Sequence, residues 1–359
     1  MKKLTTALAL LALLLLGSLL GWNWLRDHKL PNFGKSSEIY VTPEMSYQDV
    51  VEAIDAKCHI SSRKSLDRTF KSLEVEKYFK PGHYWIGHGN SSIYVARMLN
   101  NGWQAPVKLT LSGNLRLKTN IAAKIASQLM LDSATVVKAF ADKELLAEFG
   151  ATPATLFSYL MPDTYDIYWT ASVRDILTRQ KEALDAFWTD DNVAKAKALH
   201  MSRQQVSTLA SIVKAETNYE PEMPLVAGVY LNRLKIGMPL QADPTVAFCF
   251  DYKLNRVLNK HLEVESAYNT YRNTGLPPGP ICVPTRAALQ AVLDADYGTG
   301  AGPGAGEPTG SGNLYFCANA EFNGTHAFAK TLTQHNANAA AFQKELNRRA
   351  AEKRRNNAK

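Results

Sequence analysis

The stretch "STLASIVKAETNY", residues 207–219, has the spacing of an amphipathic helix and places one acid among its apolar side chains. With Val206 set at zero and a turn of about 100° per residue, Leu209 and Ile212 fall at about 300° and 240°. Glu216 falls at about 280°, within the same stripe. Burial of a carboxylate removes hydration that hydrocarbon cannot replace, which favours the protonated acid. The stretch therefore predicts a buried helix that carries a proton donor, Glu216.

A structural role for Glu216 is the alternative, with Arg233 or backbone N–H groups as its partners. The sequence after this helix bears on the choice. The next helix is expected to close at Gly237, and the segment "GMPLQADPTVAF" that follows is rich in turn residues. Such a segment can lay Gln241 and Asp243 beside Glu216. Asp243 also fits an Asx-Pro turn in which its side chain bonds the backbone.

The N-terminus reads "MKKLTTALALLALLLLGSLLGWNWLR", with about 22 uncharged residues from Leu4 to Leu25. At about 1.5 Å per residue this run spans the hydrocarbon core of a bilayer. A cleaved signal peptide is the alternative, but no small-residue cleavage site follows and no cysteine is present to carry a lipid. We therefore expect residues 1–26 to form a cytoplasmic stub and an uncleaved anchor in the cytoplasmic membrane. Lys2 and Lys3 favour a single pass with the remaining chain on the periplasmic, extracytoplasmic side.

The net charge of +8 over 359 residues is concentrated at the C-terminus. The last 16 residues hold seven Lys or Arg and two Glu, whereas the body of the chain is nearly balanced. We interpret residues 346–359 as a basic, solvated helix end, with contact to anionic lipid or wall polymer as the alternative. No zinc-finger or helix-turn-helix signature accompanies the charge, so nucleic acid is not an expected partner.

Cysteine and histidine spacing predicts neither a disulfide framework nor a metal site. No CxxC pair is present, and His326 and His335 lack two further ligands that zinc would need. We therefore expect no metal and no cofactor. One disulfide among the last three cysteines stays open, because sequence alone cannot pair them. The four cysteines are Cys58, Cys249, Cys282 and Cys317.

The chain after the anchor divides into a smaller and a larger region. We interpret residues 30–37, "LPNFGKSS", as a short linker. Residues 37–105 repeat a strand, a turn and a capped helix, with caps at Ser46 and at Ser91 or Ser92. This pattern resembles the LysM-like modules with which other cell-wall proteins bind glycan chains. The region is therefore expected to be LysM-like and membrane-proximal.

Residues 106–345 are expected to form the larger domain. An alternating strand comes first, followed by a helix from about Lys118 and by four strongly helical runs. A Gly/Ala/Pro-rich insert at 297–312 is expected to be a loop without chemistry. The predicted fold class is α+β: one transmembrane helix, small LysM-like strand/helix units and a larger α+β domain. The helical runs lie at about 133–148, 171–189, 203–217 and 222–236.

Two segments near the end of the larger domain gather polar and aromatic residues of the types that line a sugar groove. They read "AYNTYRNTGLPPGPI", residues 267–281, and "LYFCANAEFNGTHAFAKTLTQH", residues 314–335. We expect substrate-binding residues here and in the turn that precedes them. The candidates are Gln241, Asp243, Tyr268, Asn269, Tyr271 and His326.

Four motifs carry a resemblance to a known family, over roughly residues 100–345. They are "LASIVKAET", "VAGVYLNRLKIGMPLQADPTV", "YNTYRNTGLPPGPI" and "GTHAFAKTLTQH", starting at residues 209, 226, 268 and 324. Their order and separation resemble the MltG or YceG-like family of endolytic murein lytic transglycosylases. "PGHYWI" at 81–86 and the single membrane span fit the same family. The resemblance implies that Glu216 is the catalytic acid and base of a YceG-like domain.

The chain departs from the family pattern at three places. Lys214 stands where many relatives have a first acid, which removes a competitor of Glu216. Phe157 and Ser158 occupy the positions of a Glu-Gly pair, so any role of that Glu is in doubt. The segment "GPICVP" at 279–284 also differs, and the Gly/Ala-rich insert is longer than expected.

The resemblance implies a non-hydrolytic cleavage of peptidoglycan between N-acetylmuramic acid and N-acetylglucosamine. Glu216 would protonate the bridging oxygen and then deprotonate the C6 hydroxyl, leaving a 1,6-anhydro end; such cleavage could terminate nascent strands beside peptidoglycan synthases. A hydrolytic muramidase is the first alternative, if Asp243 faces Glu216 across about 6.5 to 9.5 Å and activates water. A non-catalytic wall scaffold is the second.

Overall fold

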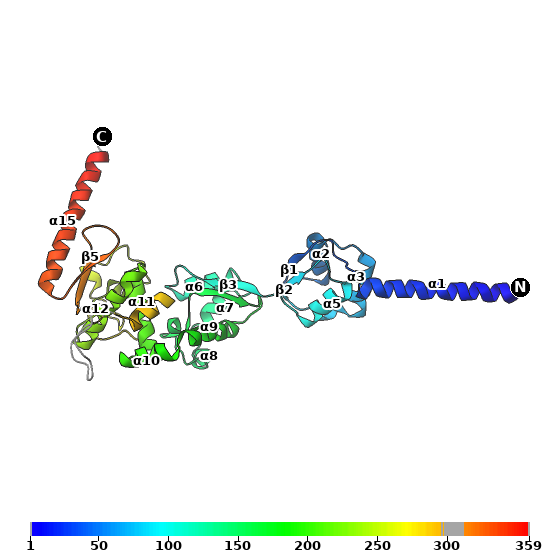
Figure 1. The fold of residues 1–359 in the computed structure, drawn as a ribbon, viewed down its shortest axis with the longest axis horizontal. Coiled ribbons are helices and arrows are strands. Elements are labelled where there is room, and N and C mark those ends of the chain that lie inside the picture. Colours follow the sequence, from blue (N-terminus) through cyan, green and yellow to red (C-terminus); the bar gives the residue numbers. More distant parts are fainter. Residues whose placement is uncertain (1, 296, 298–311, 358–359) are drawn as a thin grey trace. The chain divides into compact units, whose positions relative to one another are not determined.

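The computed structural model describes residues 2–295, 297 and 312–357, and its helices and small sheets confirm the predicted mixture of helix and strand (Figure 1). Most of the Gly/Ala/Pro-rich insert, residues 298–311, lies outside the described residues. The chain forms two compact units. The N-terminal unit runs to Leu109 and also contains Ala126–Leu131 and Tyr165–Ser172. The C-terminal unit holds the other described residues.

The N-terminal unit is built from one antiparallel strand pair and short helices. Ser46 caps α2 in a capping box with Asp49, and Ser91 caps α5, which ends at the left-handed Gly102. The caps predicted at Ser46 and Ser91 are therefore confirmed. The elements are α1 (Lys2–His28), β1 (Ser37–Val41), α2 (Tyr47–Cys58), α3 (Arg63–Ser72), α4 (Val75–Tyr78), β2 (Gly82–Ile86) and α5 (Ser92–Asn101).

Strands β1 and β2 pair with each other, from Ser37 opposite Ile86 to Val41 opposite Gly82. The helices cover this pair around one shared apolar core, so the two predicted strands belong to a single unit. The core extends into the segment that we predicted to be a linker. Phe33 is buried and bridges to Ile60, and the buried Asn32 donates to the Ser62 carbonyl and accepts from the Ser62 N–H. The prediction of a linker at residues 30–37 is therefore wrong for its first half.

Helix α1 is long and apolar enough to cross a membrane over Leu4–His28, a test that a signal sequence also passes. Its last turns belong to the folded N-terminal unit. The carboxylate of Asp27 is buried and accepts two hydrogen bonds from Arg68 of α3, at 2.6 and 2.9 Å. Ser65 of the same helix donates to the carbonyl of Arg26. The apolar helix therefore leads into the domain without an intervening flexible segment.

The C-terminal unit is mainly helical. The predicted run at 133–148 is two short helices, because Asp142 caps a new helix and interrupts the first. Strands β3 and β4 pair with each other. The elements from β3 onward are β3 (Val107–Leu111), α6 (Lys118–Ala126), α7 (Ser133–Ala139), α8 (Lys143–Ala147), η1 (Leu156–Tyr159), β4 (Asp163–Ile167), α9 (Val173–Phe187), α10 (Asp190–Ala198), α11 (Arg203–Glu216), η2 (Glu220–Glu222), α12 (Met223–Lys235), α13 (Asp243–Cys249), η3 (Asn259–His261), α14 (Arg286–Leu293), β5 (Tyr315–Ala318), β6 (His326–Ala329) and α15 (Leu332–Asn357).

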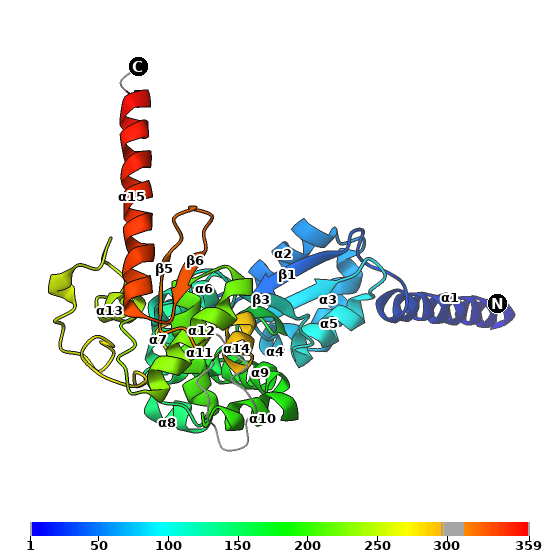
Figure 2. The same cartoon turned by 60° about the vertical axis from the view of Figure 1, so that its left-hand side comes forward.

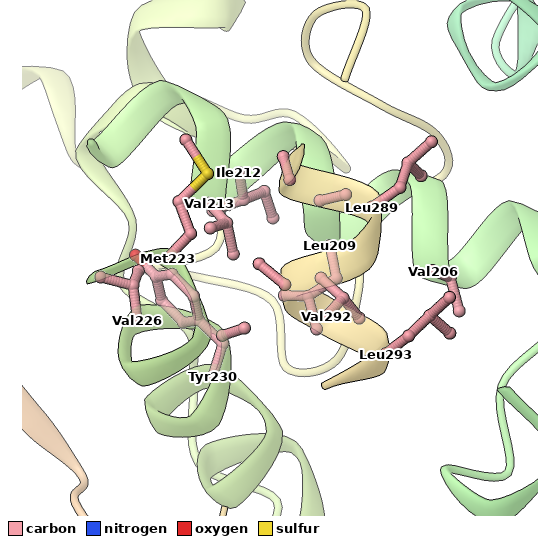
Figure 3. Close-up of a cluster of buried hydrophobic side chains, with 14 of the residues drawn as sticks. Val206, Leu209, Ile212, Val213, Met223, Val226, Tyr230, Leu289, Val292 and Leu293 are labelled. Carbon is pink, nitrogen blue, oxygen red and sulfur yellow. The ribbon is translucent and has the colours of Figure 1, made fainter. Parts of the chain in front are cut away.

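Helix α11 lies at the centre of this unit. Ser202 caps it in a capping box with Gln205, and every residue from Val206 to Val213 is buried. It packs against α12, α13 and α14. Apolar side chains of α11, α12 and α14 form the cluster labelled in Figure 3. The polar Ser211 is accommodated because its hydroxyl donates to Thr208 and accepts from the backbone of Ile281. Helix α11 is therefore enclosed on all sides instead of showing one face to water.

The antiparallel hairpin β5–β6 packs against α12 and α15 (Figure 2). Two side chains of α12 bind the chain where it enters the hairpin. Asn232 donates to the carbonyl of Asn313 at 2.9 Å, and Arg233 donates to the carbonyl of Leu314 at 2.7 Å. These contacts fix the start of β5 relative to the helix that follows Glu216.

Replacing Gly279 by Ala is expected to destabilise the protein by about 1–3 kcal/mol, because an added Cβ would stand 2.1 Å from the carbonyl oxygen of Ala154. The measurement is the thermal unfolding temperature of the full-length protein in detergent. Gly89→Ala is the matched control, since nothing lies within 4 Å of its added Cβ. Equal unfolding temperatures for the two variants would contradict the close approach of these two loops.

Candidate functional site

Glu216 is the last residue of α11, and a tyrosine of the next helix holds its carboxylate. After Thr217 the chain is extended and returns through η2 to α12. Tyr230 of α12 is 1% exposed and donates its hydroxyl hydrogen to Glu216 Oε1 at 2.7 Å. Burial raises the pKa of Tyr230 well above its usual value, so the phenol stays a hydrogen-bond donor. One oxygen of the Glu216 carboxyl group is therefore occupied as an acceptor.

The surroundings of Glu216 raise its pKa to about 7, mainly through burial of the carboxyl group. The residue keeps some exposed surface, although protein atoms surround its carboxylate. The hydrogen bond from Tyr230 lowers the pKa, the negative charge of Asp243 raises it, and the charges of His326 and Arg233 lower it. At neutral pH the group is thus present in both protonated and ionised forms, as a single acid and base requires.

Arg233 lies near Glu216 but does not pair with it directly. Its guanidinium donates to the backbone carbonyls of Leu240 and Leu314, at 2.6 and 2.7 Å. Burial lowers the pKa of Arg233, whereas the nearby Tyr230 and Glu216 favour its charged form. The structure therefore does not show Arg233 paired with Glu216 as a structural acid. Tyr230 holds the carboxyl group of Glu216 instead.

Asp243 and Tyr271 form a second carboxylate–phenol pair. Asp243 is the first residue of α13 and is exposed, and Tyr271 donates to its Oδ1 at 2.6 Å. Burial, together with this hydrogen bond, raises the pKa of Tyr271. The residue before Asp243 caps α13 without a side-chain hydrogen bond. The carboxylate thus contacts a phenol from a distant loop, and its charge acts on Glu216.

The other predicted ligands occupy different kinds of position. Asn269 is 0% exposed, and its side chain donates to Leu262 and Val264 and accepts from the N–H of Tyr271, so it organises the loop. Tyr268 packs its ring on Phe248 of α13, 4.6 Å between centroids. Gln241 is exposed and has a left-handed backbone, with its N–H donating to the carbonyl of Thr270. Their contact with substrate stays a prediction.

His326, on β6, contacts an acid that sequence reasoning did not select. Glu222 of η2 is buried and accepts two hydrogen bonds from His326, one from the backbone N–H at 2.6 Å and one at ring Nδ1 at 2.7 Å. The motif "EPEMP" favours an exposed first turn of a helix, so it gives no sign that Glu222 is buried. Tyr230 was missed for a similar reason, because it reads as one more apolar residue of α12.

The cysteines and metal-binding residue types add no further chemistry to the site. All four cysteines are free thiols, and Cys282 donates to the carbonyl of Ser211. Among the described residues no group of three or more His, Cys, Asp or Glu side chains is arranged to hold a metal ion. The titratable groups whose charges act on Glu216 include the carboxylate of Asp243, the imidazole of His326 and the guanidinium of Arg233.

The family model that matches this chain is that of the YceG-like family, over residues 39–341. This chain belongs to the YceG-like family. The match covers most of both units and includes every site residue described above. A protein of Bacillus subtilis named endolytic murein transglycosylase is 31% identical over 274 residues, which are 72% of this chain and 71% of that protein.

Two further comparisons agree with this membership. An endolytic murein transglycosylase of Streptococcus pneumoniae is 25% identical over 367 residues, with 93% of this chain covered; the chain spans 64% of that protein's length. The crystal structure of a YceG-like protein from Listeria monocytogenes is 27% identical, with a TM-score of 0.54. The match covers 84% of this chain and 98% of the Listeria chain. The YceG-like fold is thus shared along most of both chains.

Replacing Glu216 by Gln is expected to stabilise the protein more at pH 8 than at pH 5. Because the pKa of Glu216 is raised from 4.5 to about 7, the folded protein binds more protons at this group than the unfolded protein does between pH 4.5 and about 7. The free energy of unfolding of the wild type therefore falls as the pH rises through that range. At about 1.4 kcal/mol per pKa unit the gain at pH 8 reaches at most about 3 kcal/mol. Unfolding temperatures of the full-length variants measure it, with the exposed Glu220→Gln as control. A gain independent of pH would contradict the raised pKa.

Proposed function

We propose that this protein is an endolytic murein transglycosylase that cleaves the glycan strands of peptidoglycan. The observation that carries the proposal is the carboxyl of Glu216, whose pKa of about 7 suits one group that gives and then takes a proton. It lies in a motif of the YceG-like family, and the relatives from B. subtilis and S. pneumoniae bear that enzyme's name. The proposal requires neither a metal nor an organic cofactor.

In the proposed reaction Glu216 acts twice and water is not consumed. Its carboxyl donates a proton to the oxygen that links C1 of N-acetylmuramic acid to N-acetylglucosamine, and the C1–O bond breaks. The resulting carboxylate removes the proton from the C6 hydroxyl of the same muramic acid, and O6 bonds to C1. The products are a 1,6-anhydro end and a free hydroxyl on the leaving sugar, and Glu216 is protonated again. Acid–base catalysis of this kind contributes about 10²- to 10⁴-fold.

The remaining site residues take supporting roles in this proposal. Asp243 and Tyr271 lie close enough to influence Glu216 and present polar oxygens to a sugar. Gln241 and His326 are proposed to bind substrate directly. Asn269 acts through Tyr271, whose N–H it binds, and Tyr268 supports α13 by packing on Phe248. Phenol and amide side chains can donate hydrogen bonds to, and accept them from, the hydroxyl and acetamido groups of the glycan.

We further propose that α1 anchors the protein in the cytoplasmic membrane as a single pass, with both units on the extracytoplasmic side. The hydrogen bonds from Arg68 to Asp27 support an uncleaved helix, because cleavage beyond Asp27 would remove a part of the folded unit. Residues 37–105 are proposed to act as the LysM-like region that holds glycan, residues 106–345 as the YceG-like domain and residues 346–359 as a solvated basic end. Release of strands near the membrane would limit their length beside peptidoglycan synthases.

Hydrolysis is the second candidate, because the charge of Asp243 acts on Glu216 and an inverting glycosidase needs a second carboxylate to activate water. The bond from Tyr271 to Asp243 weakens this candidate, since it occupies one oxygen of the base. The two reactions differ in their products, so the choice is experimental.

Full-length protein in detergent, incubated with purified sacculi, is expected to release glycan with 1,6-anhydro ends, detected by mass spectrometry. Glu216→Gln should reduce release by about 10²- to 10⁴-fold, because the proton donor and acceptor is lost. The exposed Glu220→Gln is the control and should match the wild type. Reducing ends would indicate hydrolysis, and retained binding without any product would indicate a scaffold.

A further inference from the structure

Glu222 is a buried acid outside the reaction described above, and its two hydrogen bonds require both oxygens of a carboxylate. The backbone N–H of His326 and ring Nδ1 of the same residue lie 2.6 and 2.7 Å from separate Glu222 oxygens. An ionised carboxylate only accepts, so ring Nδ1 must donate. The hydrogen bond from the backbone N–H sets the position of strand β6, and the bond from ring Nδ1 sets the orientation of the imidazole. Ring Nε2 takes no part in the contact with Glu222.

The held imidazole packs against Phe316, on the neighbouring strand β5. The two rings meet edge to face, with centroids 5.2 Å apart and planes at 82°. Phe316 meets Tyr230 in the same way, at 5.9 Å and 86°. Rings in this geometry restrict one another, because the edge of one faces the π surface of the other. A continuous set of contacts therefore runs from Glu222 through the hairpin to the phenol that holds Glu216.

We propose that Glu222 is a positioning residue: by holding His326 it seats the β5–β6 hairpin, and through Phe316 it fixes the hydrogen bond from Tyr230 to Glu216. This inference rests on the proposed function of Glu216. It assigns no chemical step to Glu222, which contacts neither Glu216 nor the reacting atoms. It also gives the hairpin a role in holding the catalytic acid in addition to any contact of His326 with substrate.

Replacing Glu222 by Gln keeps the volume and replaces one acceptor oxygen by an NH₂ donor, so the hydrogen bond at ring Nδ1 of His326 is lost unless the imidazole proton moves to Nε2. We expect kcat for 1,6-anhydro release to fall about 3- to 10-fold with KM nearly unchanged, because the acid is misplaced while the glycan contacts remain. Glu220→Gln, in the same short helix but exposed, is the matched control and should change neither constant by more than about twofold. A fall confined to KM would overturn the proposal.

The pH profile separates positioning from a direct charge effect. The hydrogen bond from Tyr230 lowers the pKa of Glu216, so Tyr230→Phe should shift the loss of activity at high pH to higher pH. Glu222→Gln should shift it in the same direction by less, and should add no shift in the Tyr230→Phe background. Loss of the Glu222 charge alone would lower the pKa of Glu216 and shift the profile to lower pH in both backgrounds. A shift to lower pH would overturn the proposal, and so would shifts from Glu222→Gln and Tyr230→Phe that add in the double variant.

Two further measurements keep the inference testable if Glu222→Gln folds poorly or if the enzyme assay fails. Phe316→Leu keeps an apolar side chain and removes the ring that meets Tyr230 edge to face, so it should reproduce the shift to higher pH. A double-mutant cycle on unfolding of the full-length protein should show non-additive effects for Glu222→Gln and Tyr230→Phe, whereas additivity would overturn the coupling. Wild-type protein without glycan cleavage would refute the proposed function, and the unfolding cycle would still test the positioning.

Discussion

Protein atoms surround the carboxyl group of Glu216, and among the described residues Tyr230 donates a hydrogen bond to it; the other features of the site depend on this arrangement. Burial penalises the ionised form, while the phenol stabilises it. The two effects oppose each other and leave the pKa near neutrality. An acid with more donors would stay ionised, and one with none would stay protonated. A single residue can serve as both acid and base only between these limits.

The fold supplies this environment by enclosing α11 and ending it at the site. Ser202 fixes the start of the helix, and the apolar cluster with α12 and α14 fixes its direction. The catalytic candidate is therefore carried on a rigid element, while its neighbours come from α12, from the start of α13 and from the β5–β6 hairpin. Arg233 joins two of these parts, because it binds the carbonyl of Leu240, shortly before α13, and that of Leu314, just before β5.

Local signals in the sequence predicted the features that depend on neighbours along the chain. The caps at Ser46 and Ser91 and the helix of Glu216 follow from side chains within one turn of each other. Features that depend on distant partners were not predictable. Phe33 lies in a polar, glycine-containing segment, and it is buried because it joins the apolar core of the N-terminal unit, where its backbone bridges to Ile60. Glu222 is an acid in a segment with two prolines, and its carboxylate is paired by His326 of β6, which is more than a hundred residues away in the chain. The burial of Glu216 was predicted, although its cause differs: α11 is enclosed on every face, and the helix end meets α12.

The most direct test of the central claim is the pKa of the Glu216 carboxyl group in the full-length protein. Infrared difference spectra between the wild type and Glu216→Gln, recorded across the pH range, isolate the carbonyl band of the protonated acid. The account predicts that this band disappears with a midpoint near pH 7. A midpoint near 4.5, the usual value for a glutamic acid, would contradict it.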